Sequence, residues 1–167
     1  MRYPNKQPIV RRVRVTSPAA AANWSFRAEQ GNLVLVKGFV FTLATDANPA
    51  NRGILVRASE DGVVWFHTTA QFVQAASTTI RYGAHPGSNG SAGNGSAVLF
   101  EWPSDGLVLP VGHTLDVTTS AVQPGDQYSA IVLDVVEFPA TYPEWLMPLS
   151  GTHGFTYNDN DDMPGGH

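Results

Sequence analysis

Five histidines are the side chains in this sequence best suited to proton transfer or metal binding near neutral pH. No two of them stand at the spacing of an HExxH helix or of another paired metal site. His113 and Asp116 lie three positions apart in an extended stretch, which places them on opposite faces of a strand. The chain has no cysteine, so a thiolate zinc site and a cysteine nucleophile are excluded. The five histidines, which indicate no site, are His67, His85, His113, His153 and His167.

Acidic and hydroxyl side chains do not complete a catalytic pattern either. The acidic stretch 158–162 resembles a cation loop in composition, but counting from Asp159 places Met163 at position five and leaves no glycine at position six. No Gly-x-Ser-x-Gly elbow occurs. Paired carboxylates for glycoside hydrolysis stay open, because their proximity is spatial rather than sequential. We therefore expect a non-enzymatic protein with no catalytic residue, no metal and no cofactor.

Charge is distributed unevenly along the chain. All ten basic residues lie at or before Arg81, whereas ten of the fourteen acidic residues follow it. Such polarity can direct the basic N-terminal part, with Arg11, Arg12 and Arg14, onto an acidic neighbour or onto nucleic acid. The simpler reading is a strand with two of these arginines on its solvated face, so nucleic acid is not expected as a partner. No run of 18 apolar residues occurs, and a membrane is not expected either.

The elements that would carry these residues are strands. The stretch 32–43 is rich in β-branched and aromatic residues, and it predicts a long strand that forms the spine of a sheet. Lys37-Gly38 interrupts it and predicts a bulge or bend that lets one strand serve two packed sheets. The runs 54–57 and 63–66 flank Asp61-Gly62 and predict a tight hairpin. Alternation places the bulky side chains of the spine on one face: Leu33, Leu35, Phe39, Phe41 and Leu43.

Further strands are predicted along the chain. The run 9–16 forms the first, and 24–28 is expected to pair with 33–38 as a hairpin. The runs 70–74 and 77–82 follow as modest strands, and the glycine-rich stretch 83–96 is expected to be a flexible loop. A second long strand at 128–138 is the expected central partner of the spine. With about eight to ten strands and frequent turns, the fold class is all-β, a β-sandwich of jelly-roll type.

Two terminal arms flank this body. We divide the chain into an extended N-terminal arm at 1–8, a β-sandwich domain at 9–138 and an extended C-terminal arm at 139–167. Prolines keep the start of the C-terminal arm extended, and its large apolar side chains would be costly to leave in water. Docking on a neighbouring subunit and folding back on the chain's own domain both remain open. The expected partner-binding residues are Arg11, Arg12, Arg14, Tyr142, Trp145, Leu146, Met147 and Leu149.

Three stretches resemble small β-sandwich structural proteins of tailed bacteriophages. They are Trp24-x-Phe26 with the following Gly31-x-Leu33, the run from Leu43 to Arg52, and Gln123-Pro124-Gly125-Asp126-Gln127-Tyr128-Ser129. The resemblance implies a virion component of jelly-roll type, made in the host cytoplasm. It further implies a capsid decoration or cement protein that binds the major capsid protein and copies of itself, expected as a homotrimer.

Two rival functions remain. The first is a tail adaptor or fibre-associated module that reads a host receptor. The second is a carbohydrate-binding module that would use Trp65, Trp102, Tyr82 or Tyr128 as stacking platforms at strand ends. Aromatic residues in a sandwich more often belong to the core, and the exposure of these four rings separates the two interpretations.

Overall fold

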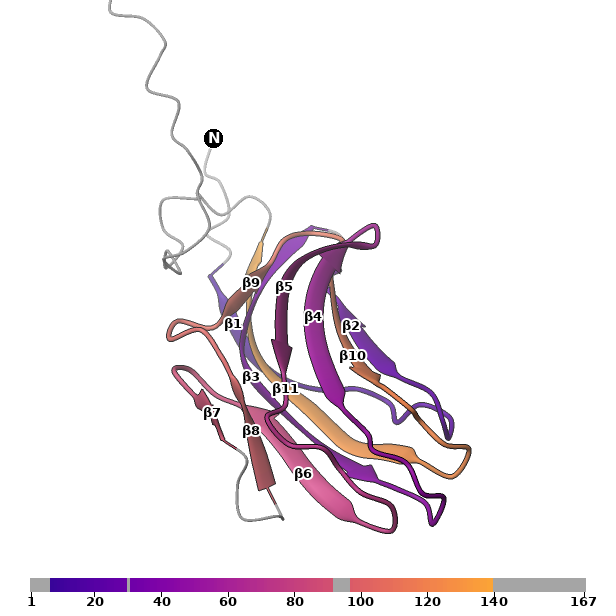
Figure 1. Ribbon diagram of the computed structural model, residues 1–167. Coiled ribbons are helices and arrows are strands. Elements are labelled where there is room, and N and C mark those ends of the chain that lie inside the picture. The colour runs from indigo at the N-terminus through magenta and orange to yellow at the C-terminus, as the bar shows by residue number, and fades with distance from the viewer. Residues whose placement is uncertain (1–6, 30, 92–96, 140–167) are drawn as a thin grey trace, which may run out of the picture.

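The computed structural model describes residues 7–29, 31–91 and 97–139, and all structural statements below concern these residues. They form eleven β-strands and no helix (Figure 1). The all-β prediction is confirmed. The strands are β1 (Ile9–Arg14), β2 (Trp24–Arg27), β3 (Asn32–Ala44), β4 (Ile54–Glu60), β5 (Val63–Thr69), β6 (Thr79–Ala84), β7 (Asn89–Ser91), β8 (Ala97–Glu101), β9 (Leu107–Leu109), β10 (Thr114–Thr119) and β11 (Gln127–Pro139).

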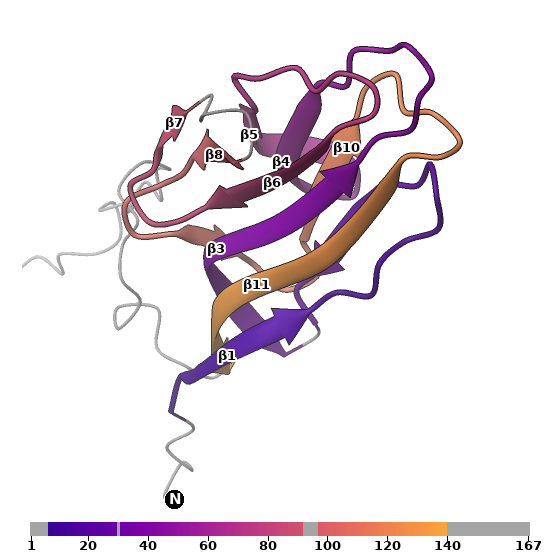
Figure 2. The ribbon, with the colours of Figure 1, turned by 90° about the horizontal axis from the view of Figure 1, so that it is seen from below.

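The strands form two packed sheets. The larger sheet has seven strands in the order β1-β11-β3-β6-β8-β7, with β9 also paired to β3. The smaller sheet has four strands in the order β2-β10-β4-β5. Figure 2 shows the larger sheet in front with the smaller one behind it. This arrangement is a β-sandwich, while its jelly-roll form stays a prediction at this stage.

The predicted central pair is confirmed, because β3 and β11 run antiparallel over their whole lengths. Gly38 pairs with Asp134 and Val36 with Val135, which leaves Lys37 as an additional residue on β3. A Cβ atom on Gly38 would lie 2.4 Å from the carbonyl oxygen of Ala84. The predicted bulge at Lys37-Gly38 is therefore present, and glycine is required there because a neighbouring backbone approaches so closely. The expectation that this bend lets one strand serve both sheets is wrong, because β11, β6 and β9, the partners of β3, all belong to the larger sheet.

The bulge also corrects the predicted face of the spine. Phe39, Phe41 and Leu43 enter the core as expected, but before the bulge the core positions are Val34 and Val36. One additional residue exchanges the two faces of a strand, because side chains alternate with a period of two. The single continuous face from Leu33 to Leu43 was therefore wrong for its first two members.

Aromatic rings from both sheets fill the space between them. The Trp24 ring, from the smaller sheet, packs edge-on against Phe41 with centroids 5.5 Å apart. Phe41 in turn stacks on Tyr82 at 5.3 Å and meets Tyr128 edge-on at 5.4 Å. Burial of each such side chain contributes about 1.5–3 kcal/mol, so this cluster holds the two sheets together.

Local strand predictions succeeded more often than pairing predictions. The β4–β5 hairpin around Asp61-Gly62 is confirmed. The expected hairpin between 24–28 and 33–38 is wrong, since β2 pairs with β10 in the other sheet. The expected strand at 70–74 contributes only one isolated bridge, between Gln74 and Arg52. β7 lies within the stretch predicted as a flexible loop at 83–96.

Candidate functional site

The basic residues predicted to bind a partner lie on β1, at the edge of the larger sheet. Arg11 contacts Glu137 at 2.9 Å, and Arg12 contacts Asp134 at 2.8 Å. Both acids belong to the neighbouring strand β11. Arg14 is exposed on the same edge strand. Two of the three predicted cations therefore already hold an acidic partner within the chain. The pair of Arg12 with Asp134 is exposed on both sides, whereas the Glu137 side chain is only 15% exposed.

The pairing register places the two ends of the body side by side. Ile9, the first residue of β1, lies opposite Glu137 near the end of β11. The chain thus enters and leaves the sandwich at one end of two neighbouring strands, as Figure 2 shows. Ile9 is 54% exposed and Val10 is 81% exposed at this point. The predicted C-terminal contact residues from Tyr142 to Leu149 lie outside the described residues.

A buried ionic cluster lies where two loops meet, the loop 45–53 between β3 and β4 and the loop 120–126 between β10 and β11. The Arg52 guanidinium is fully buried, and it donates from Nε and Nη2 to the Asp126 carboxylate, both at 2.9 Å. Nη2 also donates to Asp46 at 2.8 Å. Nη1 donates to the carbonyl oxygens of Asn48 and Ala50 at 3.0 and 2.7 Å. All three guanidinium nitrogens are therefore satisfied, as a buried arginine requires.

Both carboxylates of this cluster also bind backbone amides. Asp126 accepts from the amides of Asp46 and Gln123, at 2.9 and 2.8 Å. Asp46 accepts from the amides of Asn48 and Gly125, at 3.0 and 3.1 Å. Burial by itself raises the pKa of Asp126, but the hydrogen bonds from Arg52 and from the amides outweigh burial and hold this pKa below its ordinary value. The cluster therefore fixes loops and has no free group for chemistry.

Sequence reasoning did not identify this cluster as a structural unit. Arg52 and Asp126 both belong to the stretches that resemble phage proteins, but they lie 74 positions apart. In the sequence, the only indication of this cluster is an arginine and an aspartate that each lie inside a turn-rich segment. Nothing in the local pattern indicates that two such turns meet at the same end of a sandwich.

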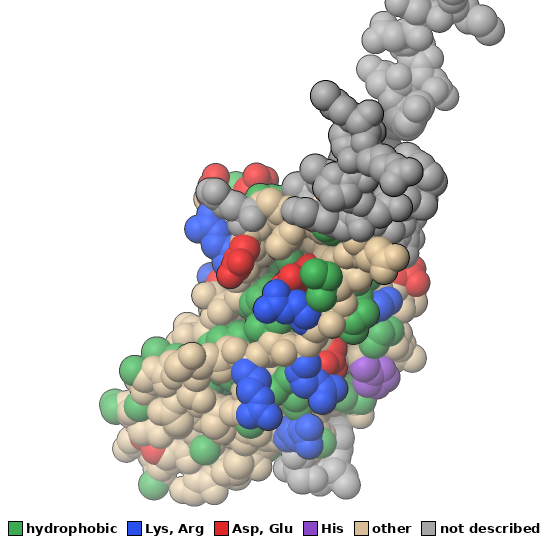
Figure 3. Space-filling model, turned by 180° about the vertical axis from the view of Figure 1, so that it is seen from behind, with side chains coloured by type: hydrophobic (Ala, Val, Ile, Leu, Met, Phe, Trp, Pro, Cys, Tyr) green, Lys and Arg blue, Asp and Glu red, His purple; other side chains and the backbone are tan. Residues whose placement is uncertain are grey.

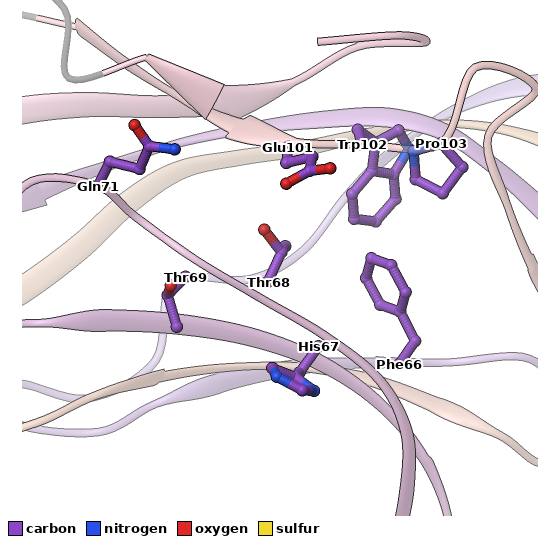
Figure 4. A pocket seen from close by; sticks show the side chains of 8 residues that line it. All are labelled: Phe66, His67, Thr68, Thr69, Gln71, Glu101, Trp102 and Pro103. Carbon is purple, nitrogen blue, oxygen red and sulfur yellow. The ribbon is translucent and has the colours of Figure 1, made fainter. Parts of the chain in front are cut away.

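A cavity of about 490 Å³ opens between the two sheets on the side of β5 and β8 (Figure 4). Side chains of β5 line one wall, and residues at the end of β8 line the other. Glu101, Gln71 and His67 are exposed, whereas Phe66 is half-buried and Trp102 is buried. The complete lining is Phe66, His67, Thr68, Thr69, Gln71, Glu101, Trp102 and Pro103. The sequence analysis did not predict this cavity.

The four aromatic residues considered as sugar platforms are placed mostly in the core. Trp102 is 3% exposed, and its indole nitrogen donates to the carbonyl oxygen of Val36 at 3.3 Å. Tyr82 and Tyr128 are at most 1% exposed. Trp65 is half-buried and donates to His113 Nδ1 at 3.1 Å. Three of the four rings thus have no open face for a ligand, which confirms the core interpretation for them.

The chain matches no protein-family model, no curated protein and no solved structure. Within 7–29, 31–91 and 97–139, no group of three or more His, Cys, Asp or Glu side chains is placed to hold a metal ion. The same residues include no helix long and apolar enough to cross a membrane.

Proposed function

We propose that this chain is a non-enzymatic structural protein of a tailed-bacteriophage virion, most specifically a capsid decoration or cement protein. The single observation that carries the assembly role is the register of Ile9 with Glu137. It brings the segments before β1 and after β11 to one end of the sandwich. Two arms that leave a rigid body together can act on the same neighbouring surface.

Strand pairing supports a jelly-roll body. When β7, β8 and β9 are set aside, the other eight strands divide into β1-β11-β3-β6 and β2-β10-β4-β5. The first of these strands then pairs with the last, the second with the seventh, the third with the sixth, and the fourth with the fifth. This order is that of one long antiparallel ribbon rolled into two sheets, and jelly rolls of this kind are common in viral capsid proteins.

The surface at the end where both arms leave suits a contact between subunits. Ile9 and Val10 are exposed apolar residues beside the ion pair of Arg11 with Glu137. Such a mixture of apolar and charged groups is typical of protein interfaces. Partners of this surface would be the major capsid protein and further copies of the chain as a homotrimer. The arm residues from Tyr142 to Leu149 would add their apolar area to the contact.

Deletion of residues 140–167 tests the proposal while keeping every described strand intact. We expect full-length protein to sediment with purified particles and the deletion variant to remain in the supernatant. The variant's far-ultraviolet circular dichroism and unfolding midpoint should stay close to those of the full chain. Retention of the folded deletion variant on particles would contradict the clamping role of the C-terminal arm.

Copy number separates a decoration protein from a tail component. Quantitative mass spectrometry of purified particles should give a ratio of this chain to the major shell protein that is a simple fraction. A few copies per particle would instead place the chain in the tail, as an adaptor or a receptor-binding module. Absence from particles would overturn the virion proposal itself.

A further inference from the structure

The lining of the cavity between β5 and β8 includes no residue of β1 or β11, the two strands at the body's arm-bearing end. β5 is the outer strand of the smaller sheet, and only a limited contact joins it to β8 across the sandwich. The two sheets therefore separate along this side and leave an opening (Figure 4). Its volume of about 490 Å³ falls within the range of small-molecule sites, about 300–1,000 Å³.

Polar side chains reach this opening from both walls and are not hydrogen-bonded to one another. Thr68 comes from β5, Gln71 follows that strand, and Glu101 ends β8. Thr69 and His67 lie at the rim and are directed away from Glu101, because successive residues of a strand alternate between its two faces (Figure 4). Within 7–29, 31–91 and 97–139, the side chains of Thr68, Gln71 and Glu101 make no hydrogen bond to one another or to another described residue. Figure 4 shows Glu101 and Thr68 directed toward each other across the cavity. Hydroxyl, amide and carboxylate groups are thus available together for one ligand.

The apolar part of the wall consists of Phe66, Trp102 and Pro103, and Phe66 is the less buried of its two aromatic rings. Phe66 is half-buried, and its ring meets the buried Trp102 edge-on with centroids 5.5 Å apart. The indole of Trp102 is itself held by Val36. The Phe66 ring therefore packs on a side chain that is itself fixed. Because its position is already set, a ligand that binds against it costs little side-chain entropy.

The charges of the cavity lining disfavour anionic ligands. The lining contains one carboxylate, one imidazole and no lysine or arginine. A phosphate or carboxylate ligand would meet no fixed positive charge and would be repelled by Glu101. A neutral ligand that carries several hydroxyl groups matches the available donors and acceptors, and its C–H face can pack on an aromatic ring.

We propose that this cavity is a binding site for a short neutral saccharide. Glu101 accepts hydrogen bonds from sugar hydroxyls, Gln71 and Thr68 complete the polar contacts, and the Phe66 ring supports the sugar's apolar face. The site uses no residue of β1 or β11, so it adds a glycan-binding activity to the proposed structural role. It also differs from the platforms considered in the sequence analysis, because Trp102 acts only as a support.

A two-dimensional NMR titration of the full-length chain tests the proposal. The probes are the methyl glycosides of glucose, galactose, mannose and N-acetylglucosamine. We expect at least one glycoside to shift the backbone amide signals of 66–71 and 101–103, with a dissociation constant on the order of 1 mM. No shift with any of the four, or shifts confined to other residues, would overturn the proposal.

Variants decide whether the named groups bind the sugar. Glu101→Gln and Thr68→Val should each weaken binding at least about threefold, since the first replaces a charge-assisted hydrogen bond to the ligand by a neutral one and the second removes a hydroxyl partner. The matched controls are Glu29→Gln and Thr79→Val, which alter exposed residues outside the cavity and should leave the affinity unchanged. Equal affinities in all four variants would contradict the assignment.

One further probe separates a sugar site from a peptide site. The amide of Nα-acetyl-lysine offers a cation to Glu101 and an aliphatic chain to Phe66. We expect it to produce no saturable shift at the cavity. Tighter binding of this probe than of every glycoside would overturn the saccharide assignment in favour of a basic peptide.

Discussion

Two sets of arginine–carboxylate pairs lie in this molecule, and their surroundings differ completely. The Arg52 cluster is sealed between loops, with both Arg52 and Asp126 fully buried. The pair of Arg12 with Asp134 lies on the outer face of the β1–β11 edge, where both side chains are more than half exposed. The N–O distances are nearly identical, at 2.9 and 2.8 Å. Distance alone therefore says little about what an ion pair does.

The two pairs differ in how many buried charges and hydrogen-bond donors would lose their partners if the pair were broken. Around Asp126, one carboxylate serves a buried guanidinium and two backbone amides. Loss of it leaves a charge and two donors away from water. Around Asp134, water replaces whatever is removed, and salt screens the attraction. We therefore assign stability to the buried cluster and leave the surface pairs free for contacts with partners.

The largest effect is expected from Asp126→Ala. This substitution leaves the buried Arg52 without its main partner and removes the acceptor of two amides. We expect a loss of about 3–5 kcal/mol in the free energy of unfolding, the usual cost of breaking a buried pair from one side. Urea unfolding followed by tryptophan fluorescence measures it.

Asp134→Ala is the matched control, because it removes the same group from an exposed pair. Asp126→Asn retains one acceptor oxygen and should fall between the two, which keeps the test useful if the alanine variant does not fold. A free energy of unfolding that is equal in Asp126→Ala and Asp134→Ala would contradict the distinction between the two regions.

The second-largest effect is expected from acid, which should weaken the buried cluster. The pKa of Asp46 is also below its ordinary value. Burial raises this pKa, but the hydrogen bonds from Asn48 and from the amide of Gly125 lower it by more. A carboxylate whose pKa is lower in the folded state than in the unfolded state adds stability above the unfolded pKa. That stability is lost as the pH falls through the folded pKa.

We therefore expect the free energy of unfolding to be almost constant near neutral pH and to fall below about pH 4, where unfolded aspartates gain protons. Urea unfolding at a series of pH values from neutral to strongly acidic measures this dependence. Asp126→Asn should show a flatter acid dependence than the parent chain, because one titrating carboxylate is gone. An identical slope in the two proteins would show that Asp126 does not contribute to it.

Much of the fold could be predicted from local sequence. Alternating β-branched and aromatic residues located the two long strands, Asp61-Gly62 located a hairpin, and Gly38 located a bulge. Each of these features is determined within a few residues, by side-chain alternation or by the backbone freedom of glycine.

The wrong predictions concern partners that are distant in sequence. The short strand β2 was expected to pair with the nearby β3, but its partner β10 lies about ninety residues away. Arg52 and Asp126 likewise meet only because the fold brings two turns together. The cavity depends on how far the sheets separate near Phe66 and Glu101, which is a property of three-dimensional packing. No local pattern encodes these distances.

The smallest effect on stability is expected at the surface pairs, where a substitution should change binding to particles instead. Arg12→Ala should leave the urea midpoint unchanged, because the guanidinium and its partner Asp134 are both open to water. If this edge contacts an acidic surface of a neighbouring subunit, the same variant should bind particles more weakly in co-sedimentation, and more so at low salt, where charge attraction is strongest. Arg27→Ala, an exposed arginine on the smaller sheet, is the control for general loss of positive charge. Equal particle binding by these two variants would remove the β1 edge from the interface, whereas a lowered midpoint in Arg12→Ala would mean that an exposed pair also stabilises this fold.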